Sequence, residues 1–151
     1  YFMDNLSTYQ AFGSHLRSVL PRVSVKQLAT QPEAEWQLRQ HANLLYTIFP
    51  LSQLLVQQDH LIWVRLEPIS EARTRISLKT MAPKSSRPDD YWQRNHEITC
   101  TTLAEDFVIG ESIQSGLGSG ANGHLTFGRY EGALHRFNSA VDRMIGDRDT
   151  A

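Results

Sequence analysis

One acidic residue in the second half of the chain, Asp106, stands where a carboxylate is costly. At about 100° per residue of an α-helix, Asp106 projects into an apolar stripe, whereas Glu105 points well away from it. The stripe consists of Leu103, Phe107, Gly110, Ile113 and Leu117. A carboxylate directed toward a core needs a cation, a metal ion or hydrogen bonds. We therefore expect Asp106 to be either a buried acid paired with an arginine or a backbone amide, or a ligand in a functional site.

Other polar and aromatic residues are weaker candidates for a site. Gln114 shares the face of Asp106 two turns later, which favours a polar cavity there. His96 and Cys100 lie four residues apart, but the six histidines form no recognisable metal-ligand pair, and an isolated histidine is more often structural. Tyr46, Phe49 and Trp63 are aromatic residues of neighbouring predicted strands. They either form the core or line a cavity between sheet and helix, where apolar ligands bind.

The glycine-rich segment 118–123 matches the pattern G-x-G-x-x-G of dinucleotide-binding proteins. That pattern requires a preceding strand and a following helix in a parallel βαβ unit. Here a long predicted helix precedes it, so we expect a flexible connector that binds no nucleotide.

Helices are predicted in the last third of the chain, after the proline-containing segment 83–88. Asp89 or Asp90 can cap a helix that continues without proline to about Leu117, where glycines can end it. A second helix is predicted over 130–145, because its apolar residues recur on one side.

Strands are predicted before these helices, from Val23 to about Lys84. Alternating or β-branched runs separated by short turns are typical of an antiparallel meander with one face on a core. The predicted strands cover 23–26, 36–39, 44–49, 54–56, 61–66 and 74–79. A sheet followed by a long helix that lies across it is an α+β arrangement.

The composition limits the class of protein. The chain has 151 residues, enough for a single domain over 1–151, and 21% of them are charged. A formal net charge of -1 argues against a nucleic-acid partner. One cysteine excludes a disulfide framework or an iron–sulfur cluster of its own, and the lack of a long apolar run argues against a membrane span. We expect a cytoplasmic protein. The first methionine of the chain is residue 3, so either two tag residues precede the true start or the chain is cut from something longer.

Two C-terminal segments resemble the end of the large (alpha) subunit of Rieske-type ring-hydroxylating oxygenases. They are the Glu-Asp pair and Gln-x-Gly-Leu motif within 105–117, and the Phe-Gly-Arg motif followed by Glu within 125–137. The segment Gly13-Ser14-His15-x-Arg17, the pair Pro21-Arg22 and the segment 46–50 are also similar to that family. The resemblance thus covers nearly the whole chain.

The resemblance implies a helix-grip fold (START/Bet v 1-like), an antiparallel sheet wrapped around a long C-terminal helix, with the N-terminal part missing. It also implies a mononuclear non-haem Fe(II) held by two histidines and one carboxylate. The carboxylate falls on Asp106, in agreement with the helical stripe. The family's His-x4-His segment and its Rieske 2Fe-2S domain have no counterpart here. We therefore expect that this chain alone contains no iron and is inactive.

The predicted function is to hold an aromatic or other small organic substrate for oxygen insertion, as in the breakdown of aromatic hydrocarbons by bacteria. Weaker candidates for the substrate pocket are Asn5, Tyr9, Phe49, His96 and Gln114. The implied partners are the substrate, dioxygen, a reductase or ferredoxin, and further copies of the subunit, arranged as a trimer by resemblance. The alternatives are a metal-free helix-grip module that binds an apolar small molecule, and a folded remnant that keeps only an oligomerisation surface.

Overall fold

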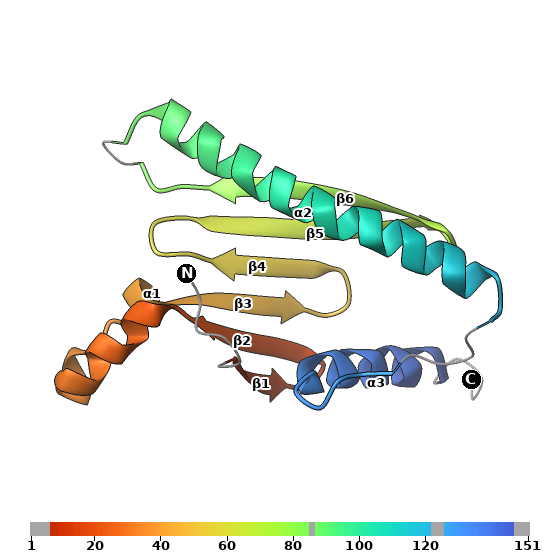
Figure 1. The fold of residues 1–151 in the computed structure, drawn as a ribbon, viewed down its shortest axis with the longest axis horizontal. Helices are drawn as coiled ribbons and strands as arrows, with labels where there is room; N and C mark the ends of the chain where they lie inside the picture. Colours follow the sequence, from red (N-terminus) through yellow and green to blue (C-terminus); the bar gives the residue numbers. More distant parts are fainter. Residues whose placement is uncertain (1–6, 85–86, 122–125, 147–151) are drawn as a thin grey trace.

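The computed structural model describes residues 7–84, 87–121 and 126–146. Asn5, one of the predicted pocket residues, lies outside these ranges. The described part combines one antiparallel sheet with two long helices and several short helical segments, which confirms the α+β class and is consistent with a helix-grip fold (Figure 1). Among the described residues, no helix has both the length and the hydropathy to cross a membrane.

The sheet has six strands in the sequential order β1-β2-β3-β4-β5-β6, all pairs antiparallel. The strands are β1 (Thr8–Phe12), β2 (His15–Pro21), β3 (Ala42–Ile48), β4 (Ser52–Val56), β5 (Leu61–Ser70) and β6 (Arg73–Met81). The last four confirm the predicted strands between residues 44 and 79. The meander follows from short turns, each of which returns the chain beside the strand it has left.

Two of the predicted strands are wrong, and two strands were not predicted. Residues 23–26 belong to a 3-10 helix, η1 (Val23–Thr30). Residues 36 and 37 link a second 3-10 helix, η2 (Glu33–Glu35), to a one-turn helix, α1 (Leu38–His41), which contains residues 38 and 39. Alternation over only four residues fits one helical turn as well as a strand, and the burial of Leu28 within η1 favours the helical form.

The two long helices are α2 (Asp89–Gly118) and α3 (Gly132–Gly146), close to the predicted bounds. In Figure 1, α2 crosses the sheet over β5 and β6, and α3 lies at the other end, beside β1 and β2. His96 on α2 faces the sheet, since its Nδ1 lies 2.9 Å from Oγ1 of Thr80 in β6. Phe137 on α3 packs edge-on against Phe49, with ring centroids 5.6 Å apart.

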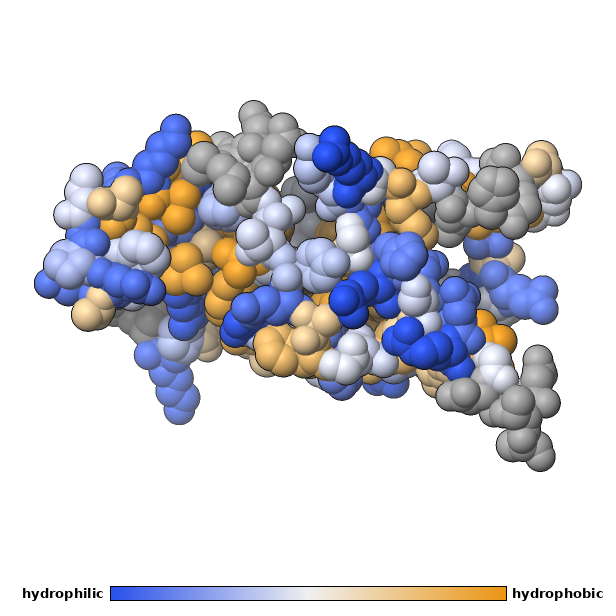
Figure 2. All heavy atoms as spheres, turned by 90° about the horizontal axis from the view of Figure 1, so that it is seen from below, coloured by the Kyte–Doolittle hydropathy of each residue, from blue (hydrophilic) through white to orange (hydrophobic). Residues whose placement is uncertain are grey.

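The fully buried apolar core of the described part is small. It consists of Leu16, Leu28, Ala42, Ile62 and Ala140. None of the 30 residues of α2 is fully buried. Seen from below, apolar patches lie between hydrophilic side chains on the surface (Figure 2). A sheet with two helices and so much uncovered apolar surface retains open hollows between its elements.

Candidate functional site

A mainly apolar hollow lies over the middle of the sheet and is called the central hollow. Its volume is about 540 Å³, and it lies between β1–β6 and the start of α3. The strand register places Ser18 opposite Leu45, and both line the hollow, so one face of the sheet forms its floor. Leu134 and Phe137 of α3 form a side wall. Such a mainly apolar hollow suits an apolar small molecule.

A second hollow, the α2 hollow, adjoins the first at the turn between β5 and β6. Its volume is about 640 Å³, and Leu66 and Thr74 line both hollows. From α2 it is lined by Phe107, Gly110 and Gln114, together with Glu111. Gln114 therefore lines a hollow on the sheet side of α2.

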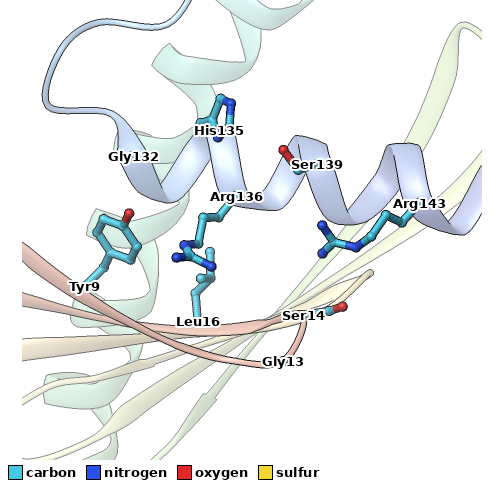
Figure 3. Close-up of a pocket in the computed structure, with 9 residues that line it drawn as sticks. All are labelled: Tyr9, Gly13, Ser14, Leu16, Gly132, His135, Arg136, Ser139 and Arg143. Atoms are coloured by element: carbon cyan, nitrogen blue, oxygen red, sulfur yellow. The ribbon is translucent and has the colours of Figure 1, made fainter.

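A third hollow, the α3 cavity, adjoins the central hollow at the opposite end. Its volume is about 370 Å³, and it lies between α3 and the hairpin of β1 and β2 (Figure 3). Tyr9 and Leu16 line both this cavity and the central hollow. The three hollows thus adjoin one another along the sheet from α2 to α3, and together they are called the trough.

The expectation that Asp106 lies buried between α2 and the sheet is wrong for this chain. Asp106 is exposed and lines none of the three hollows. The physical reason is the rotation of α2: Phe107, Gly110 and Gln114 face the sheet, and Asp106 projects about 100° away from Phe107. Other members of its stripe are uncovered too, since Ile113 is 53% exposed and Leu117 is 40% exposed. No described element covers this part of the stripe.

The remaining predicted pocket residues differ in their positions. Tyr9 lies at the junction of the central hollow and the α3 cavity. Phe49 is half-buried, packs against α3 and lines none of the three hollows. His96 is held between Thr80 and Cys100, whose Sγ lies 3.5 Å from its Nε2. Both therefore join helix to sheet. Contact of any of these residues with a substrate stays a prediction.

A partly buried polar cluster between the turn before β5 and the start of α2 was not predicted from the sequence. Nδ1 of His60, which is 3% exposed, lies 2.7 Å from Oδ1 of Asp59. The Tyr91 hydroxyl donates a hydrogen bond to Oδ2 of the same carboxylate at 2.9 Å. Burial alone raises the pKa of Asp59, but the hydrogen bonds from His60 and Tyr91 outweigh it, so this pKa lies below its ordinary value. The sequence signal was only the short polar turn between the strands predicted over 54–56 and 61–66.

The described residues do not by themselves make a metal centre. In the ranges 7–84, 87–121 and 126–146, no three side chains of His, Cys, Asp or Glu come together in a group that could hold a metal ion. Asp106 is thus a single carboxylate, whereas a non-haem iron site of the facial-triad type needs two histidines beside it. The part of the chain that the structure describes does not fit a complete iron site.

Comparison with known proteins identifies the family. The family model for the ring-hydroxylating alpha subunit (catalytic domain) matches residues 4–147. No curated protein and no solved structure matches the chain significantly. The family match covers the sheet, α2 and α3, and hence the whole trough. The chain therefore belongs to the catalytic-domain family of the ring-hydroxylating alpha subunits.

Proposed function

We propose that this chain forms the substrate-holding part of an oxygenase catalytic domain, and that Asp106 is the carboxylate ligand of iron in the intact subunit. The family match over residues 4–147 is the observation that carries the proposal. It includes both the sheet that floors the trough and the helix that bears Asp106. The two histidine ligands and the Rieske cluster would be supplied by parts of the intact subunit outside this chain, and the chain alone is expected to be inactive.

The trough would hold the substrate by excluding water. Leu16, Leu45 and Leu66 present apolar surface from the sheet, and Phe137 does so from α3. Burial of apolar substrate surface there is worth about 25 cal/mol per Å² before the costs of association. Gln114, at the α2 end, offers an amide that can orient a polar substituent. These residues bind and orient, and orientation directs the position that is attacked.

The exposure of Asp106 is compatible with this proposal, because its surroundings are exposed with it. Asp106 lies one residue before Phe107 and one turn before Gly110, both of which line the α2 hollow. A further layer of protein over the stripe would bury Asp106 together with Ile113 and Leu117. The two histidines would belong to that layer.

A second candidate is a metal-free module that binds an apolar small molecule. The observation in its favour is that the central hollow is formed by this chain's own residues, while Asp106 is exposed and belongs to no group of three or more metal-ligating side chains in the described part. Both candidates require ligand binding in the trough. Only the oxygenase requires incorporation of oxygen.

A pair of strand variants tests the trough. Ser18 lines the central hollow, and Ser77 is exposed on the opposite face of the sheet, because it alternates with the half-buried Ile76 and Leu78. We expect Ser18→Phe to fill the hollow and weaken saturable binding of naphthalene by about tenfold or more, and Ser77→Phe to leave it unchanged.

The oxygenase itself is tested with the same pair in the intact subunit. When the intact subunit is supplied with its electron donor and ¹⁸O₂, the product should contain ¹⁸O in the wild type and in Ser77→Phe. The amount of this product should be much smaller in Ser18→Phe. Binding of naphthalene without any ¹⁸O-labelled product from a panel of aromatic compounds would favour the metal-free module. Absence of binding to the wild-type chain would contradict both candidates.

A further inference from the structure

The α3 cavity carries an excess of positive charge. Arg136 and Arg143 line it from α3, and they lie on the same face of that helix because they are seven residues apart. Figure 3 shows both side chains on the hairpin side of α3, with Arg136 above Leu16. The lining contains no carboxylate. Two guanidinium groups beside one cavity create a positive potential that attracts an anion.

Neither arginine is neutralised by a described residue. The ion pairs within the ranges 7–84, 87–121 and 126–146 join His60 and Arg87 to Asp59, and Arg75 to Glu67. Arg136 and Arg143 also make no hydrogen bond to another described residue, and both are exposed, so a ligand can reach them. The Ser14 and Ser139 side chains add hydroxyl groups to the same lining. These groups are the donors that a carboxylate accepts from.

The cationic cavity is not isolated from the apolar part of the trough. Tyr9 and Leu16 belong to both linings, and the central hollow begins beyond them. The Tyr9 ring lies close to Gly132, where an added Cβ would come within 2.7 Å of its hydroxyl oxygen. The aromatic ring thus stands at the junction, held against the first turn of α3. A molecule with an apolar body and one anionic end fits this sequence of surfaces.

We infer that the trough recognises an organic acid: the apolar body lies in the central hollow, and the carboxylate binds Arg136 and Arg143 in the α3 cavity. This inference rests on the proposed function and names the class of substrate. Guanidinium groups bind carboxylates through charge-assisted, often bidentate, hydrogen bonds. The apolar hollow supplies affinity for the ring, and the two arginines distinguish an acid from the neutral hydrocarbon.

The test compares a neutral compound with its carboxylate. Binding of naphthalene and of 2-naphthoate is measured with the wild-type chain, with the double variant Arg136→Gln/Arg143→Gln, and with Arg94→Gln. Arg94 is an exposed arginine of α2 that lines none of the hollows, and it controls for the loss of positive charge. We expect 2-naphthoate to bind the wild type about tenfold more tightly than naphthalene. The double variant should lose this difference, and Arg94→Gln should keep it.

The outcomes separate this inference from the proposed function. Equal affinities for the two compounds in the wild type, or a preference for 2-naphthoate that survives in the double variant, would overturn the inference while leaving the apolar trough in place. Failure of both compounds to bind would instead contradict the proposed function. Inorganic phosphate should displace 2-naphthoate only weakly, since it has no apolar body. If phosphate displaced bound 2-naphthoate at the same concentration as free 2-naphthoate does, the claim that the trough recognises the apolar body and the carboxylate together would be overturned.

Discussion

The Asp59 carboxylate joins the hairpin of β4 and β5 to the start of α2. It accepts a hydrogen bond from Tyr91 of the helix and lies against the buried His60, whose ring contacts that of Trp92 edge-on at 5.7 Å. Nε2 of His60 is buried without a hydrogen-bond partner in the described part. The cluster therefore depends on the charge of one carboxylate for its stability.

The lowered pKa of Asp59 predicts a dependence of stability on pH. The folded chain keeps the Asp59 carboxyl ionised below its ordinary pKa of 3.8. Its contribution to the free energy of unfolding is therefore present above pH 3.8, and it is lost as the pH falls through the pKa of the folded state. Asp59→Asn should lower the free energy of unfolding by about 1 kcal/mol at pH 7, and its stability should fall less steeply below pH 4. Urea unfolding at several pH values measures both effects.

The control for this prediction is Asp142→Asn, which removes an exposed carboxylate of α3. Its stability should follow that of the wild type at every pH. An Asp59→Asn variant as stable as the wild type at pH 7, with an unchanged acid transition, would contradict the role of the cluster.

How much of the site could be predicted differs from residue to residue. The position of Gln114 depends only on the geometry of one helix, and in the structure this residue lines the α2 hollow, while its contact with a substrate stays a prediction. The burial of Asp106 depends on which elements cover α2, and a helical stripe carries no information about its cover. The two arginines of the α3 cavity were not predicted, because their partner surface is a hairpin far away in the sequence.

At the scale of elements, the hairpin of β1 and β2 depends on a single backbone conformation. Its turn is the two-residue loop Gly13-Ser14 between the paired Phe12 and His15, and Gly13 has φ 62. A positive φ at the first central position is typical of the turns that match the twist of a hairpin. The hairpin forms one wall of the α3 cavity, so this turn also positions the candidate anion site.

Gly13→Ala should therefore destabilise the chain by about 1 kcal/mol, because an L-residue at positive φ is strained although its Cβ would meet no atom within 4 Å. Gly110→Ala is the matched control, since its Cβ also has open space but its backbone is helical. That variant should be stabilised by up to about 1 kcal/mol. If thermal unfolding gave equal shifts for the two variants, the assigned turn conformation would be wrong.

The strands that could be predicted are those with sustained patterns. Thr74–Lys79 alternates over six residues, and Leu61–Leu66 is rich in β-branched and aromatic residues. Both patterns therefore favour a strand over a helix or a turn. Val23–Lys26 alternates over four residues only, and it is helical in the structure. The first hairpin carried a usable signal in Gly13-Ser14 between two polar–apolar segments. That segment was interpreted only as part of the family resemblance, and no turn was predicted there.

At the scale of the whole molecule, the two long helices leave the middle of one sheet face open. α2 lies at the β6 end and α3 at the β1–β2 end (Figure 1), and the central hollow lies between them. Exposed apolar residues of α2, including Ile113, border no described neighbour that buries them. An apolar surface of this kind marks a contact with a ligand or with further protein. In the proposed oxygenase both would apply: the substrate would fill the trough, and the layer with the two histidines would cover α2.

The iron content of the intact subunit tests the central assignment most directly. Asp106→Asn keeps the size of the side chain and removes its charge, and Glu105→Gln does the same at the neighbouring position outside the stripe. Metal analysis should find iron in the wild type and in Glu105→Gln, and a loss of more than about tenfold in Asp106→Asn, with unchanged circular dichroism in all three. Full iron occupancy in a folded Asp106→Asn subunit would contradict the account.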